Sequence, residues 1–80
     1  MKTKEFNTLL GRKIKLLRGI NGLTQMDIAR ELGYNSTGMV SQIESGNRGM
    51  DNNKILKLFK FFSSIKQPEF SIVSSALNTS

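Results

Sequence analysis

The chain has 80 residues, with 12 Lys or Arg against 6 Asp or Glu, and therefore a formal net charge of +6 and a pI near 10.1. This length and a hydrophobic content of 38% allow one domain with a modest core. Cys and His are both absent, and the few acids are scattered, so we expect no enzyme, metal, cofactor or small-molecule ligand. No apolar run could span a membrane and residues 1–7 do not resemble a signal peptide, so we expect a cytoplasmic protein with no membrane partner.

The N-terminal third has the pattern of an amphipathic helix. Its expected apolar face consists of Leu9, Leu10, Ile14, Leu17 and Phe6. Glycines at 19 and 22 predict its end, after which Leu23 should lie under the next helix.

Residues 24–46 contain two short helical patterns. Thr24 is a good N-cap and Asp27 stands where a capping carboxylate would, so the first helix should begin there and stop at Gly33. Ser36 is expected to cap the second helix, which should end at Gly46. The apolar residues of the two helices are Ile28, Ala29 and Leu32, then Met39, Val40 and Ile43. Two amphipathic helices joined by so short a turn indicate a helix-turn-helix, whose second helix can enter a DNA major groove.

The outer face of this second helix should carry Thr37, Gly38, Ser41 and Gln42. Such small, uncharged, hydrogen-bonding groups suit base edges, and Gln can pair with adenine through two hydrogen bonds. The face could equally be an ordinary solvated surface. Gly38 costs about 1 kcal/mol in a helix relative to Ala, which indicates close approach to the preceding helix or to DNA, or a tolerated glycine in the first turn.

Asp51 can cap a further helix, which is expected to bury Ile55, Leu58, Phe59 and Phe62. Leu56, Phe61 and Ile65 do not fit that stripe, so they could pack on the C-terminal segment or on a second subunit. Pro68 suits the first turn of a last helix carrying Phe70, Val73 and Leu77, although residues 70–73 could instead form a short strand.

Positive charge flanks the helix-turn-helix rather than filling it. Residues 1–22 carry six basic residues against one acid, residues 23–46 one against three, and residues 47–66 five against one. This distribution suits a protein in which flanking segments hold phosphates while neutral side chains address bases. Charge alone is also compatible with a solvated basic surface.

The segment from Leu10 to Ile65 resembles the Cro/cI-type (XRE) family of helix-turn-helix regulators, in the fragments IKLLR, GLTQMDIARELG, VSQIESGNR and the apolar helix after Asp51. The resemblance implies a compact, all-α, five-helix lambda-repressor-like domain over residues 1–80, with a core at about 6–66 and a C-terminal segment at 67–80. The stretch from Gly33 to Glu44 is about one residue longer than in the phage repressors, which leaves the start of the recognition helix open by one position.

The resemblance also implies roles for individual residues. Gln25 would bind a phosphate and brace the recognition helix, and Arg18 with Glu44 would form a structural ion pair. Thr37, Gly38, Ser41 and Gln42 match the base-reading positions, although Gly38 has no side chain to read with. The expected phosphate-binding residues, besides Gln25, are Asn35, Ser36, Asn47, Arg48 and Lys54.

The sequence thus predicts a DNA-binding transcriptional regulator, most like a repressor from a phage or mobile element. Because one short helix reads few base pairs, we expect a homodimer on a palindromic operator, formed through Phe61, Phe70, Val73 and Leu77. The alternatives are an antitoxin or restriction-modification controller of the same fold, a protein-interaction module without a DNA role, and a basic amphipathic protein of membrane surfaces.

Overall fold

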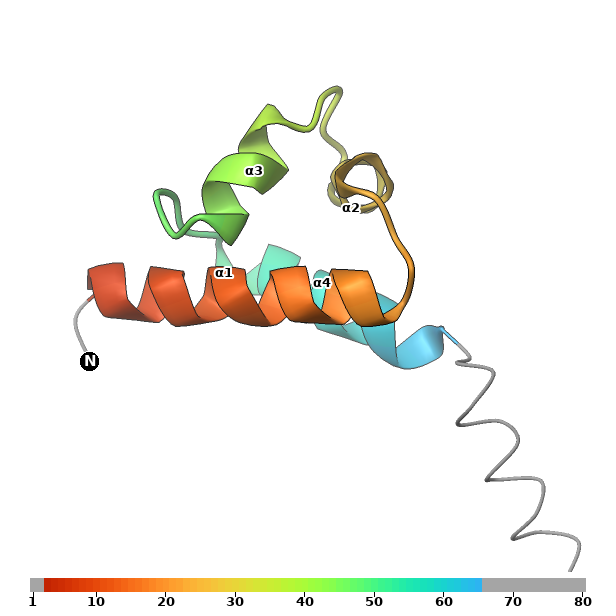
Figure 1. The fold of residues 1–80 in the computed structure, drawn as a ribbon, viewed down its shortest axis with the longest axis horizontal. Coiled ribbons are helices and arrows are strands. Elements are labelled where there is room, and N and C mark those ends of the chain that lie inside the picture. The colour runs from red at the N-terminus through yellow and green to blue at the C-terminus, as the bar shows by residue number, and fades with distance from the viewer. Residues whose placement is uncertain (1–2, 66–80) are drawn as a thin grey trace, which may run out of the picture.

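The computed structural model describes residues 3–65, and this part of the chain is entirely helical, with no strand (Figure 1). The helices are α1 (Thr3–Ile20), α2 (Gln25–Leu32), α3 (Gly38–Glu44) and α4 (Asn52–Ser64). The predicted all-α class is therefore confirmed for this region. The expected fifth helix, with Phe70, Val73 and Leu77, lies outside the described residues. None of the four helices is both long enough and apolar enough to span a bilayer.

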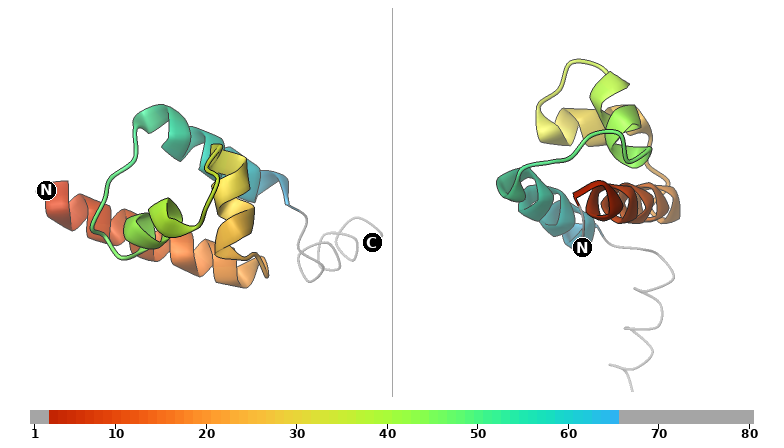
Figure 2. Two further views of the ribbon diagram at one scale, coloured as in Figure 1. Left: turned by 90° about the horizontal axis from the view of Figure 1, so that it is seen from above. Right: turned by 90° about the vertical axis from the view of Figure 1, so that its left-hand side faces the viewer.

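The helices form two layers. The right-hand view of Figure 2 shows α1 and α4 side by side in one layer, with α2 and α3 in the other, and Figure 1 shows the same arrangement from a second direction. All four helices contribute to a single core, which consists of Leu10, Ile14, Ile28, Ala29, Leu32, Val40, Ile43, Leu58 and Phe62. The layer formed by α2 and α3 thus packs on the layer formed by α1 and α4.

The apolar face of α1 is narrower than the sequence predicts. Leu10 and Ile14 are buried and Leu17 packs against the core, but Phe6 and Leu9 remain 47% and 51% exposed. Because successive helical residues differ by about 100° around the axis, Leu9 cannot face the same side as Leu10. The expectation that Phe6 and Leu9 belong to the core face was wrong.

The boundaries of α2 follow the predicted signals. The Thr24 hydroxyl accepts a hydrogen bond from the backbone N–H of Asp27 at 3.1 Å, and the Asp27 carboxylate accepts one from the backbone N–H of Thr24 at 2.8 Å. At the other end Gly33 adopts a left-handed conformation with φ of 82°, and the backbone N–H of Tyr34 donates to Ala29. Reciprocal capping and a left-handed stop therefore fix both ends of this eight-residue helix.

The start of α3 differs from the prediction. The helix begins at Gly38 with Thr37 as its N-cap, not Ser36, and no side chain caps it. Thr37 has helical φ and ψ of −83° and −8°, whereas a side-chain cap requires the extended conformation that Thr24 adopts. The end is as expected, because Gly46 follows with φ of 83° and the backbone N–H of Asn47 donates to Gln42.

The capping carboxylate of α2 predicts a small pH dependence. The hydrogen bonds with Thr24 lower the pKa of Asp27 below its ordinary value of 3.8. A lowered folded-state pKa stabilises the fold above the unfolded pKa, and this contribution is lost as the pH falls through the folded value. We therefore expect Asp27→Ala to melt slightly below the wild type at pH 7, with the difference shrinking below about pH 4. Thermal melts by circular dichroism at pH 7 and below about pH 4 would show this change. A difference in melting temperature between variant and wild type that stayed the same at both would contradict it.

Close packing of α1 on the C-terminal end of α3 depends on Gly11. A Cβ atom added there would overlap the carbonyl oxygen of Ile43 and lie 2.8 Å from that of Glu44. The helix backbones therefore meet directly at this point, since only glycine leaves room for two carbonyl groups against an α-helix. This contact sets how closely the backbones of α1 and α3 approach each other.

Candidate nucleic-acid interface

A three-residue network holds the C-terminal end of α3. The Arg18 guanidinium donates to both oxygens of Glu44, from Nε to Oε2 at 2.7 Å and from Nη2 to Oε1 at 3.1 Å. Gln25 adds a third hydrogen bond, from Nε2 to Oε1 of Glu44 at 3.1 Å. The ion pair predicted between Arg18 and Glu44 is present, and Gln25 does brace α3. The network joins the end of α1, the start of α2 and the end of α3 at one buried carboxylate.

The surroundings of this network favour the charged pair. The Glu44 side chain is 4% exposed and that of Arg18 19% exposed, and Arg18 Nη1 also donates to the Leu23 carbonyl at 3.0 Å. Hydrogen bonding to Glu44 raises the pKa of Arg18 above its ordinary value, against the opposing effect of burial, and the negative charge of Glu44 adds to the rise. A buried carboxylate with three charge-assisted or amide donors is well satisfied, so the pair fixes geometry rather than binding a ligand.

The face of α3 opposite this support is open. Val40, Ile43 and Glu44 are buried, whereas Gly38, Ser41 and Gln42 are exposed and Thr37 is half-buried. The expected base-reading residues thus share the outer surface, and none of them carries a charge. A Cβ atom on Gly38 would meet only the Ser36 hydroxyl, at 3.9 Å, so packing within the described chain does not require glycine there. Close approach to α2 therefore does not explain this residue.

Loops at both ends of α3 present the expected phosphate-binding groups to solvent. Asn35 and Ser36 precede the helix and Asn47 and Arg48 follow it, and all four are exposed. The second loop is held against α1, because Gly46 and Gly49 lie so close to Thr8 and Asn7 that a Cβ atom on either glycine would come within 3 Å of them. This contact fixes the loop that carries Asn47 and Arg48 directly after α3.

Lys54, which the resemblance implies to be a phosphate-binding residue, contacts Tyr34. Its Nζ donates to the Tyr34 hydroxyl at 2.9 Å and lies 4.5 Å from the centroid of the same ring. The two residues come from α4 and from the turn between α2 and α3. Sequence patterns gave no signal for this pair, because 20 positions separate its members.

Sequence reasoning also missed Gly11, although a signal was present. Glycine inside a helix costs about 1 kcal/mol relative to alanine, so its occurrence in the middle of α1 needed a reason. The three-dimensional structure supplies that reason in the contact with α3.

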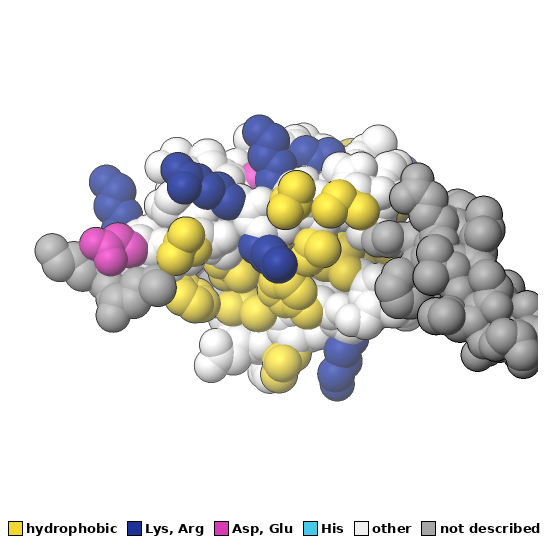
Figure 3. Space-filling view, turned by 60° about the horizontal axis from the view of Figure 1, so that its bottom comes forward, with side chains coloured by type: hydrophobic (Ala, Val, Ile, Leu, Met, Phe, Trp, Pro, Cys, Tyr) yellow, Lys and Arg dark blue, Asp and Glu magenta, His cyan; other side chains and the backbone are white. Residues whose placement is uncertain are grey.

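A second surface is apolar and lies away from α3. Phe6, Leu9, Leu16 and Ile20 are all exposed, and their spacing puts them on the side of α1 opposite Gly11, where α3 packs. Figure 3 shows a face on which apolar side chains gather with Lys and Arg among them.

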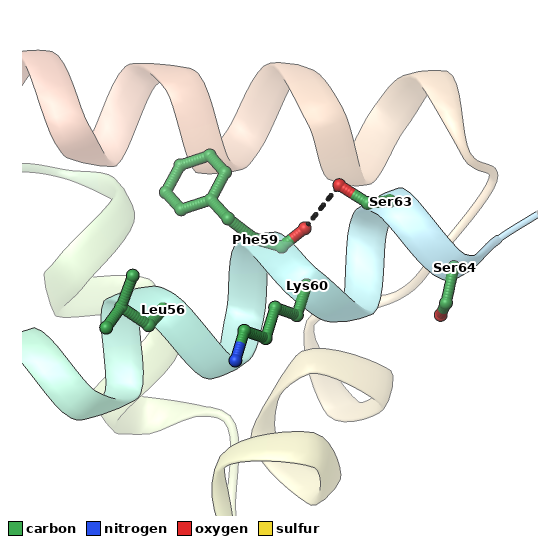
Figure 4. Close-up of a pocket in the computed structure, with 5 residues that line it drawn as sticks. All are labelled: Leu56, Phe59, Lys60, Ser63 and Ser64. Carbon is green, nitrogen blue, oxygen red and sulfur yellow. Dashed lines mark hydrogen bonds between the residues drawn. The ribbon is translucent and has the colours of Figure 1, made fainter.

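On α4, a shallow hollow adjoins Leu56, which is 59% exposed (Figure 4). The hollow is also lined by Phe59, Lys60, Ser63 and Ser64, and the Ser63 hydroxyl donates to the Phe59 carbonyl at 2.9 Å. Phe59 points from α4 toward α1. Phe61, expected at a dimer interface, is half-buried against the core, with its ring centroid 6.0 Å from that of Phe62.

Comparison of the chain with protein-family models, curated proteins and solved structures found no match in any of the three.

Proposed function

We propose that this protein is a sequence-specific, double-stranded DNA-binding transcriptional regulator of the Cro/cI type, acting in the cytoplasm as a repressor. Helix α3 enters the major groove, Thr37, Ser41 and Gln42 contact base edges, and the backbone at Gly38 approaches the DNA closely. Gln25, Asn35, Ser36, Asn47 and Arg48 contact phosphates.

One observation carries this proposal: α3 is anchored on one side and open on the other. Its inner side is fixed by Glu44 and by the contact with Gly11, while its outer side exposes Gly38, Ser41 and Gln42. A short helix held this firmly with a neutral, hydrogen-bonding outer face matches what direct readout of bases requires. The net charge of +6 supplies the attraction to phosphates.

Selection of bound sequences from a random DNA pool tests the proposal. We expect enrichment of one palindromic site whose half-sites are about one helical turn apart. Binding to that site should weaken steeply with added salt, because phosphates neutralised by the protein release counterions. No enrichment at low salt would contradict the proposal. A protein-interaction module without a DNA role would give that result, whereas an antitoxin or restriction-modification controller would behave as the repressor does.

Two substitutions separate base reading from phosphate binding. Gln42→Ala should cost about 1–3 kcal/mol on the selected site and relax the preference at one base pair. Arg48→Ala should weaken selected and random DNA about equally and lower the salt dependence by one phosphate contact. Binding titrations on both DNAs at several salt concentrations measure these effects. If Gln42→Ala weakened both DNAs equally, the assignment of Gln42 to base reading would be wrong.

We further propose that residues 67–80 complete a five-helix domain and that this segment, with Phe61, supports a homodimer. The exposed apolar residues of α1 and Leu56 leave part of the helical layer uncovered, and Phe70, Val73 and Leu77 recur at helical spacing. Light scattering coupled to size exclusion tests the dimer. A mass of 9.0 kDa for the free protein, together with a complex mass that corresponds to one protein copy per selected DNA, would contradict it.

A further inference from the structure

The beginning of α3 is held by fewer side-chain hydrogen bonds than its end. Its N-cap residue Thr37 makes no side-chain capping bond, and the helix has only seven residues. So short a helix is not stable by itself in water, so its first turn depends on contacts made elsewhere. The end of α3, by contrast, is fixed by Glu44.

Tyr34 and Lys54 join the turn before α3 to α4. Tyr34 follows the stop of α2 directly, its backbone N–H donates to Ala29 at 2.8 Å, and its ring packs against the core. The backbone of Lys54 is also held in place, because its N–H donates to the side chain of Asp51, the N-cap of α4, at 2.9 Å. The 2.9 Å bond from Lys54 Nζ to the Tyr34 hydroxyl therefore joins two anchored positions across the fold.

We propose that the Tyr34–Lys54 contact is a tether that positions the first turn of α3. Lys54 thereby affects DNA recognition through Tyr34 and does not bind a phosphate. This inference rests on the proposed function. The tether lies beside the residues before α3, so it controls the placement of Thr37 and Gly38, whereas Ser41 and Gln42 are positioned from the Glu44 end. Both side chains are half-buried, so water competes only partly with the bond.

A set of four variants tests the tether: Tyr34→Phe, Lys54→Met, the two combined, and Lys57→Met. Tyr34→Phe removes only the hydroxyl, and Lys54→Met removes the ammonium while keeping an apolar stem. Lys57→Met is the matched control, since Lys57 is an exposed lysine about one turn further along α4 and its loss changes the net charge equally.

In the free protein, hydrogen exchange measured by NMR should be faster at the amides of residues 35–40 in Tyr34→Phe and Lys54→Met, and unchanged in Lys57→Met. On the selected DNA, each of the two tether variants should lose affinity by up to about tenfold, and the double variant no more than the worse single one. The preference should relax at the base pairs read from the Thr37 end, with the salt dependence unchanged.

The opposite pattern overturns the inference. If Lys54→Met lowered the salt dependence by about one phosphate contact while Tyr34→Phe had no effect, Lys54 would be a phosphate ligand. If the wild type selected no DNA sequence, the proposed function would fail, and the exchange data on the free protein would still decide the tether. Equal exchange in all variants would then exclude it.

Discussion

Gly11→Ala is expected to reduce the free energy of unfolding by about 3 kcal/mol or more, at the upper end of the range for overpacking a closely packed site. The added methyl group would overlap backbone carbonyl oxygens of Ile43 and Glu44, which cannot rotate away as a side chain could. Relief requires α3 to move off α1. For a domain of this size such a loss approaches the total stability, so urea denaturation should show a largely unfolded variant.

Gly19→Ala is the matched control, because it makes the same chemical change in the same helix. A Cβ atom at Gly19 meets no other atom within 4 Å, and the residue lies inside α1. Alanine should therefore stabilise the protein there by up to about 1 kcal/mol. If Gly11→Ala and Gly19→Ala had similar unfolding midpoints, α1 and α3 could not be packed as closely as described.

Arg18→Ala is expected to cost about 3–5 kcal/mol, because removing one partner leaves a buried charge without its counterion. Glu44 would keep only its hydrogen bond from Gln25, and its side chain is 4% exposed. Glu44→Ala should cost less, since the Arg18 side chain is 19% exposed and can turn toward water. Thermal melts should show both variants below the wild type, with Arg18→Ala the lower.

A double variant distinguishes the ion pair from general packing. Arg18→Met combined with Glu44→Met removes both charges and keeps apolar volume, so it should lose less stability than the summed losses of Arg18→Met and Glu44→Met measured singly. Additive losses would show that the pair has no coupling. Base preference on selected DNA should change less than stability in any of these variants that fold, because the network lies behind the reading face.

Local signals in the sequence were sufficient for most helix boundaries. A capping side chain or a left-handed glycine acts within a few residues, so its effect can be predicted without the rest of the fold. This holds for the caps at Thr24, Asp27 and Asp51 and for the glycines at 33 and 46. Ser36 failed as a cap because the chain before α3 takes a helical conformation at Thr37, and neighbouring residues alone did not indicate this. The longer stretch from Gly33 to Glu44 left the start of this helix open by one position, and the N-cap of α3 is Thr37, one residue after the predicted Ser36.

The sequence alone determined the all-α class of the described region, the two short helices of the central pair and the polar face of the second one. These features follow from periodicity and capping, which are local properties of the chain. Family resemblance, and not periodicity, indicated that Arg18 would meet Glu44.

The tertiary structure decided how deeply α3 sits on α1 at Gly11 and where the Lys54 ammonium goes. It also left Phe6 and Leu9 outside the core. Each of these outcomes depends on the distance or direction between helices far apart in the chain. That geometry arises from the packing of all four helices together, so no short stretch of sequence specifies it.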